Sequence, residues 1–201
     1  MEGFTGIGHS VEDCLYKAKW EMTEHVELLR QRGLPAPEIN RDPTIVVQNV
    51  KEGSTMSRIE SAVSLFNKGY SCSQAVLSTY GPQYGLDEAA ALRLATAFGA
   101  GMGRMADTCG AVTGAFMVLG LKHGTTLPDD REGKERTYQR VRQFASRFKA
   151  RCGSAVCRDL LGCDISTPEG LDLARQRGLF ATACPRFVQT AAEILEELLA
   201  S

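Results

Sequence analysis

Cysteines are the residues of this chain whose type and spacing point most directly to chemistry. The chain contains seven, and four of them lie where the sequence predicts the start of a helix: Cys72, Cys109, Cys157 and Cys184. Unpaired backbone amides and the helix dipole stabilise a thiolate at such a position and lower the pKa of the thiol. Four cysteines at helix starts therefore favour a common site with reactive or ligating sulfur.

Cys109 opens the most informative segment, because a long apolar run follows it over residues 115–119. Asp107 or Thr108 can cap a helix there, since a short polar side chain accepts a hydrogen bond from an unpaired amide of the first turn. We expect Gly124 to end this helix in the left-handed conformation. The alternative is an inert, small cysteine in a tightly packed helix.

Glycines surround Cys109 on both sides. Gly110 and Gly114 are four residues apart on one helical face, and each costs about 1 kcal/mol relative to alanine, so a backbone or a ligand should approach them closely. The preceding loop, residues 99–104, lacks both the Walker and the dinucleotide spacing. We expect this loop to line the Cys109 site, and we take Gly110, Gly114 and Arg104 as candidate substrate-binding residues.

Composition limits the function classes. The chain of 201 residues carries a formal net charge of −1, so no nucleic-acid partner is expected. It has no apolar run of about 18 residues that could span a membrane and no secretion signal at its start. Seven cysteines without an export signal favour a reducing compartment, the cytoplasm, where thiols are usually free, metal-bound or redox-active.

The sequence predicts a mainly α protein, with a helical bundle-like C-terminal domain after a small α/β N-terminal fragment. Residues 1–50 combine a strand near residues 4–8, a helix opened by Ser10 and stopped by Gly33, and a strand at 44–47. Residues 51–55 have linker composition. Residues 3–8, 10–15 and 33–38 of this part resemble a HicB-like antitoxin domain, of which only a fragment is visible. Cys14 lies on the apolar side of its helix and is expected to be buried.

From Met56 the pattern is helical throughout. Helices are predicted up to Gly69, after the cap Ser71, after Asp87, after Thr167 and from Cys184 onward, together with a short one after Ser154.

A long helix over residues 131–151 has an apolar side with Tyr138, Val141, Phe144, Ala145 and Phe148. Its other face is basic, and its residues are Lys134, Arg136, Arg140, Arg142, Arg147, Lys149 and Arg151. Such a face is usually solvated, and a site for an anionic partner is the alternative.

Residues 56–201 resemble the C_GCAxxG_C_C family of redox-active proteins. The block Cys-Gly-Ala-x-x-Gly is residues 109–114, preceded by residues 69–76 around Cys72 and followed by residues 157–162 and 184–188. The resemblance implies thiol redox chemistry with an unestablished substrate, carried by Cys72, Cys109, Cys157 and Cys184. Cys152 and Cys163 are extra to the pattern, and Cys152 could compete as a resolving thiol.

Two functions from different classes fit these cysteines. In a thiol–disulfide oxidoreductase, Cys109 would attack a disulfide, a second cysteine would resolve the intermediate, and the partner would be a redox protein or a small thiol. In a binding module, the same four thiolates would hold zinc or an iron–sulfur cluster. The chain has no Cys-x-x-Cys pair, so either site must be assembled by the fold. A helical scaffold with packed cysteines is the third interpretation.

Overall fold

The structure, a computed structural model, describes residues 27, 30–33 and 56–200. The chain divides into two units, Met1–Ser54 and Thr55–Ser201, and the second is described here by itself. In the first unit, Gly33 has a φ of 66° directly after a helical turn, as expected for a helix end. The strands, the HicB-like segment, the linker and Cys14 lie outside the described residues and stay predictions.

Two capped helices open the second unit. Helix α2, Arg58–Asn67, is capped by Ser57, and helix α3, Cys72–Tyr80, is capped by Ser71. Both caps are reciprocal, because the residue three positions on, Glu60 or Gln74, accepts from the backbone N–H of the cap. Gly69 lies between the two helices with a φ of 101°. Helix α3 begins directly after the cap Ser71, as predicted.

Three elements lead from α3 to the central helix. The 3-10 turn η1, Pro82–Tyr84, is followed by α4, Glu88–Thr96, and by the single turn α5, Gly99–Met102. Helix α6, Gly110–His123, comes next. The structure corrects two expectations here: Cys109 itself is the cap residue of α6, and Gly124 has a φ of −65°. Glycine is needed at 124 because an added Cβ would lie 2.4 Å from the Gly120 carbonyl oxygen.

The C-terminal half contains two long helices separated by three short ones. These are α7, Arg131–Cys152; α8, Cys157–Leu161; α9, Pro168–Gln176; α10, Leu179–Thr182; and α11, Cys184–Leu199. Ser154 accepts from Val156 N–H at 3.0 Å but does not cap α8, which begins two residues later than predicted.

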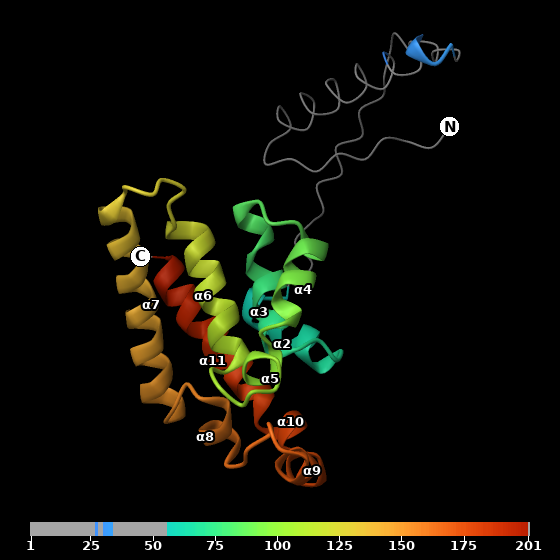
Figure 1. The fold of residues 1–201 in the computed structure, drawn as a ribbon, viewed down its shortest axis with the longest axis vertical. Coiled ribbons are helices and arrows are strands. Elements are labelled where there is room, and N and C mark those ends of the chain that lie inside the picture. The colour runs from blue at the N-terminus through green and yellow to red at the C-terminus, as the bar shows by residue number, and fades with distance from the viewer. Residues whose placement is uncertain (1–26, 28–29, 34–55, 201) are drawn as a thin grey trace. The chain divides into compact units, whose positions relative to one another are not determined.

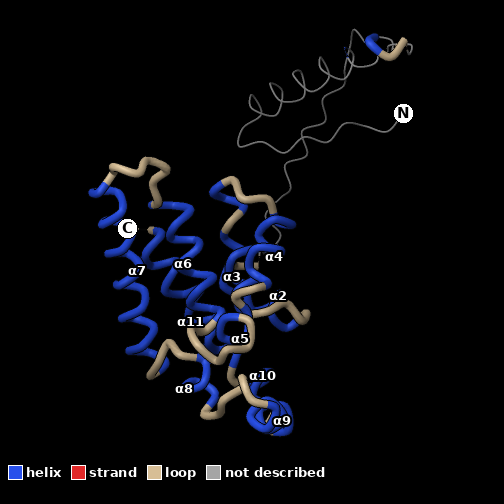
Figure 2. The backbone as a smooth tube through the Cα atoms, viewed as in Figure 1, coloured by secondary structure: helices blue, strands red, loops and turns tan. Residues whose placement is uncertain are grey.

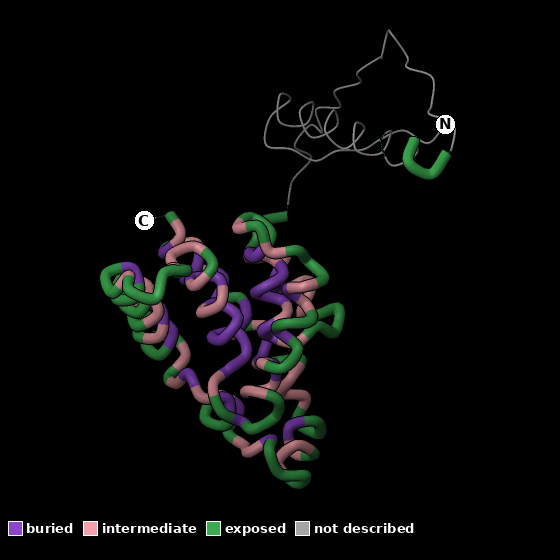
Figure 3. The backbone as a smooth tube through the Cα atoms, turned by 45° about the horizontal axis from the view of Figure 1, so that its top comes forward, coloured by how far each residue is buried: buried purple, intermediate pink, exposed green. Residues whose placement is uncertain are grey.

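Helices α3, α6, α7 and α11 lie side by side, and α5, α8, α9 and α10 gather at one end of them (Figure 1). The buried stretches of the backbone (Figure 3) include the start of α6, where every residue from Gly110 to Ala115 is buried. The second unit is thus a helical bundle without a strand among its described residues, which confirms the predicted fold class.

The apolar side of α7 differs from the prediction at one residue. Phe144 and Phe148 are fully buried, whereas Tyr138 is 55% exposed. The inward stripe runs instead through Thr137, Val141, Phe144 and Phe148, at spacings of four, three and four. Tyr138 points about 100° away from that stripe, the rotation of one helical residue.

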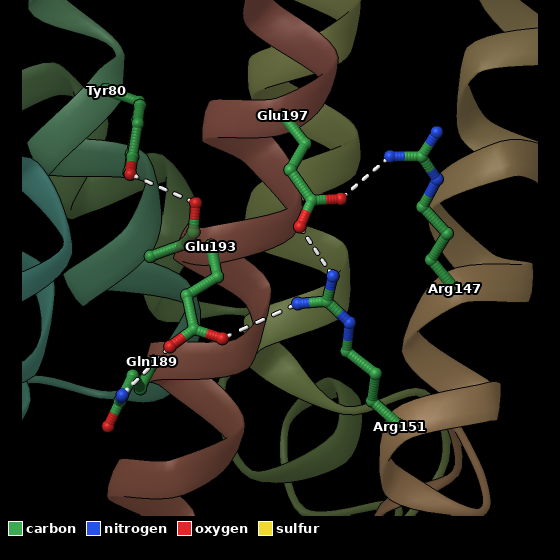
Figure 4. A network of polar contacts seen from close by, with 7 residues as sticks. Tyr80, Arg147, Arg151, Gln189, Glu193 and Glu197 are labelled. Carbon is green, nitrogen blue, oxygen red and sulfur yellow. Dashed lines mark hydrogen bonds and ion pairs between the residues drawn. The ribbon is translucent and has the colours of Figure 1, made fainter.

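Much of the basic face of α7 is paired with carboxylates. Arg147 contacts Glu197 of α11 at 2.8 Å, and Arg151 bridges Glu193 and Glu197 (Figure 4). Within α7 itself, Arg136 pairs with Glu132 and Arg142 pairs with Glu135. The pairs of Arg147 and Arg151 link α7 to α11.

Candidate functional site

All four cysteines that begin helices line one cavity of about 450 Å³. They come from four different helices or caps, namely α3, α6, α8 and α11. Each is nearly covered: Cys72 is 8% exposed, Cys109 4%, and Cys157 and Cys184 7% each. The six cysteines of the described residues are all free thiols.

Close packing of α6 on α3 brings Cys109 and Cys72 together. An added Cβ on Gly110 would lie 3.0 Å from the Ser73 amide nitrogen and 3.2 Å from the Cys72 Cβ. On Gly114 it would lie 2.9 Å from the Ser73 carbonyl oxygen. The two glycines therefore admit the backbone of a neighbouring helix, one of the two roles that the sequence left open.

A left-handed helical turn forms one wall of the cavity. Residues 100–104 all have φ between 53° and 70°, and Gly103 N–H donates to the Gly99 carbonyl at 2.8 Å. Left-handed helix costs about 1–2 kcal/mol per non-glycine residue, so surrounding contacts must hold this turn. Ala100 and Gly101 line the cavity, which fits the expected position of this loop.

A short antiparallel bridge fixes Cys157 beside Cys109. Cys109 N–H donates to the Ala155 carbonyl at 2.8 Å, and Cys157 N–H donates to the Asp107 carbonyl at 2.6 Å. The two loop segments lie at the same end of the bundle as α5 (Figure 2). This bridge joins residues some fifty positions apart in sequence, and no local signal predicts it.

Hydrogen bonding shifts the pKa values of the Cys109 and Cys72 thiols in opposite directions. The Cys72 S–H group donates to the Cys109 sulfur, which lowers the pKa of Cys109, and the amides of Ala111 and Val112 lower that pKa further against the effect of burial. The same contact with Cys109, a contact with Cys184 and burial hold the pKa of Cys72 well above its usual value. Cys109 is thus the more acidic and Cys72 the less acidic thiol of this pair.

The pKa of Cys157 is raised, unlike that of Cys109, although Cys157 also begins a helix. Burial raises its pKa to about 12, with Cys109, Cys184 and Cys163 adding to the rise. Its helix α8 has only five residues, so the favourable amide field is weak against desolvation. Cys152 and Cys163 do not line the cavity. Burial also raises the pKa of Cys152.

The candidate substrate-binding residues do not all lie at the cavity. Gly110 lines it, whereas Gly114 faces α3 and Arg104 is exposed away from it. Sequence reasoning did not single out the aromatic lining, which is Phe66, Tyr70, Phe180 and Phe187. Tyr70 and Phe187 could have been noticed, because they fall within the sequence blocks around Cys72 and Cys184.

Within the described part of the chain, no three side chains of His, Cys, Asp or Glu are placed to hold a metal ion together. In the same part, none of the helices combines the length and the apolar character needed to cross a membrane.

Comparison with known proteins gives one match. Residues 70–198 match the family model described as "Putative redox-active protein (C_GCAxxG_C_C)". No curated protein and no solved structure matches the chain, and nothing in these comparisons supports the expected HicB-like segment. Since the match covers more than half of the chain and all four cavity cysteines, this protein belongs to the C_GCAxxG_C_C family.

Proposed function

We propose that this protein is a thiol–disulfide redox protein in which Cys109 is the attacking thiolate and Cys72 the resolving thiol. The observation that carries the proposal is their direct contact in one cavity, with the pKa of Cys109 lowered and that of Cys72 raised. A nucleophile with a depressed pKa beside a proton-bearing partner is what thiol–disulfide exchange requires.

These two cysteines are sufficient to reduce one substrate disulfide to two thiols. The Cys109 thiolate attacks one sulfur of a substrate disulfide, a mixed disulfide forms, and the other substrate sulfur leaves as a thiolate. Cys72 gives its proton to a leaving thiolate and attacks the Cys109 sulfur. The second substrate thiol is released, and a Cys72–Cys109 disulfide remains. The substrate is reduced by two electrons, and a small thiol or a redox protein of a reducing compartment restores the dithiol.

Cys72 is the better resolving group among the cavity cysteines. It is already hydrogen-bonded to the Cys109 sulfur, whereas the interaction of Cys157 with Cys109 is electrostatic rather than a hydrogen bond. Cys184 contacts Cys72. The same chemistry therefore allows the Cys184 sulfur to attack Cys72 in the Cys72–Cys109 disulfide.

The test uses the full chain, reduced and purified without air. After mild oxidation with a small disulfide, we expect two thiols to disappear together and peptide mapping to find a Cys72–Cys109 disulfide. Cys72→Ser should accumulate the mixed disulfide on Cys109, and Cys109→Ser should abolish the rapid reaction. Cys152→Ser is the matched control, because Cys152 lies outside the cavity. Oxidation that leaves Cys109 reduced in the unaltered protein would refute the proposal.

Metal and acid-labile sulfide content of the same preparation tests the alternative function. Stoichiometric zinc or iron that is lost in both Cys72→Ser and Cys109→Ser would make these cysteines ligands and would replace the redox proposal.

A further inference from the structure

We propose that the cavity selects small, uncharged disulfides with apolar flanks and rejects charged disulfides and the disulfides of folded proteins. This inference rests on the proposed function and names the substrate class of the same site.

The first observation is the absence of charge from the lining. Among the described residues, none that lines the cavity is Asp, Glu, Lys, Arg or His, and the titratable groups of the lining are the four cysteines and Tyr70. A charged ligand would lose water there and meet no charged group other than the proposed Cys109 thiolate, and this desolvation is costly. An anionic ligand would in addition be repelled by the Cys109 thiolate.

The second observation is the apolar character of the walls. Phe66, Phe180 and Phe187 line the cavity together with the four cysteines, and Leu160 and Leu161 of α8 add further apolar side chains. Aromatic and aliphatic walls bind methylene and aromatic groups by burying them. The disulfide of the substrate would therefore be flanked by apolar carbon rather than by carboxylates or amines.

The third observation concerns size and access. A volume of about 450 Å³ lies in the range of small-molecule sites. The exposed lining residues Asn67, Gly69, Tyr70 and Ala181 form the mouth, while each sulfur-bearing residue is at most 8% exposed. A small molecule can enter such a cavity, but a disulfide fixed within a folded protein cannot bring its sulfur to Cys109.

Three small disulfides of similar length test the charge rule: hydroxyethyl disulfide, which is neutral, dithiodipropionate, a dianion, and cystamine, a dication. Each reacts with the reduced full chain under pseudo-first-order conditions, and aliquots are quenched with N-ethylmaleimide for mass mapping of Cys109. Each rate is divided by that of a free small thiol, which removes the intrinsic reactivity of the compound. We expect the neutral compound to react at least about tenfold faster than the dianion on this scale, with the dication in between and insulin not reduced.

A change of charge at the mouth provides a matched pair of variants. Asn67 is the last residue of α2 and is exposed, so Asn67→Lys should fold normally, because a cation suits a helix C-terminus. It should raise the normalised rate with dithiodipropionate several-fold. Lys68→Gln is the control, since Lys68 is adjacent in sequence but does not line the cavity, and it should leave the order of the three compounds unchanged.

The outcomes separate the two proposals. Normalised rates within threefold of one another, or rapid reduction of insulin, would overturn the substrate class and leave the redox function standing. No reaction of Cys109 with any disulfide would overturn the redox function. In that case alkylation tests whether the cavity selects against charge. If Cys109 reacts faster with neutral iodoacetamide than with anionic iodoacetate after the same normalisation, the charge selectivity of the cavity is retained. Equal normalised rates refute that selectivity.

Discussion

Replacing Gly101 with alanine should destabilise the protein more than the same change two residues later. Gly101 has a φ of 70°, and an added Cβ would lie 2.7 Å from the Cys157 Cβ and 2.9 Å from both the Ala106 Cα and the Asp107 nitrogen. The left-handed conformation costs alanine about 1–2 kcal/mol. Overpacking against backbone that cannot move away adds about 1–3 kcal/mol. The expected loss in unfolding free energy is therefore about 2–5 kcal/mol.

Gly103 is the matched control for this substitution. It has a φ of 63°, and its added Cβ would meet only the Ala97 carbonyl oxygen, at an ordinary 3.5 Å. Gly103→Ala should therefore lose only the conformational part, about 1–2 kcal/mol. Urea denaturation followed by circular dichroism measures the unfolding free energy of both variants. The comparison requires that the m-value, the dependence of that free energy on urea concentration, is the same for both.

Two results would refute this reasoning. If both variants lose the same free energy within about 0.5 kcal/mol, a resolution typical of such comparisons, then no steric contact exists between the left-handed turn and Cys157. If neither variant loses stability, the turn is not left-handed in solution.

Three further predictions follow from the packing and the electrostatics. Gly114→Ala should destabilise the protein because the Ser73 carbonyl oxygen lies 2.9 Å from the added Cβ, whereas Gly120→Ala, in open space on the same helix, should stabilise it by about 0.5–1 kcal/mol in thermal unfolding; equal shifts would argue against the α3–α6 contact. Cys72→Ala should raise the pKa of Cys109, because it removes the largest cause of its lowering, while Cys72→Ser keeps an O–H donor and should raise it less; the pH dependence of iodoacetamide alkylation measures both. The pKa of Cys157 rises from 9.0 to about 12 on folding. The stability that the protonated Cys157 thiol contributes is therefore complete below about pH 9 and is lost as the pH rises toward 12, at up to about 1.4 kcal/mol per pH unit. Urea denaturation at several alkaline pH values measures this loss, and a Cys157→Ser variant whose unfolding free energy falls with pH as steeply as that of the unaltered protein would contradict it.

Local sequence signals were sufficient for several helix starts. Ser71 and Gln74 supply a reciprocal cap, and Gly81-Pro82 ends the same helix, so the bounds of α3 follow from neighbouring residues alone. Thr167-Pro168 opens α9 in the same way. These predictions succeed because a capping hydrogen bond joins residues two or three positions apart.

The helix that begins after Cys109 shows where local reasoning stops. Asp107 and Thr108 are good capping residues, yet their backbone is used instead in the bridge to residues 155–157. The cap position therefore falls to Cys109, whose sulfur faces the first amides of α6. A long-range backbone pairing thus overrides a local preference.

The sequence by itself determined that this protein is a helical bundle with four cysteines at helix starts and two glycines that admit a close neighbour. Only the tertiary structure decided that the four cysteines line one cavity and that this cavity lacks charged side chains. It also decided that Cys109 and Cys157 differ in acidity. The physical reason is that a helix start acts on its own first turn, whereas burial and the contact with Cys72 depend on residues far away in the chain.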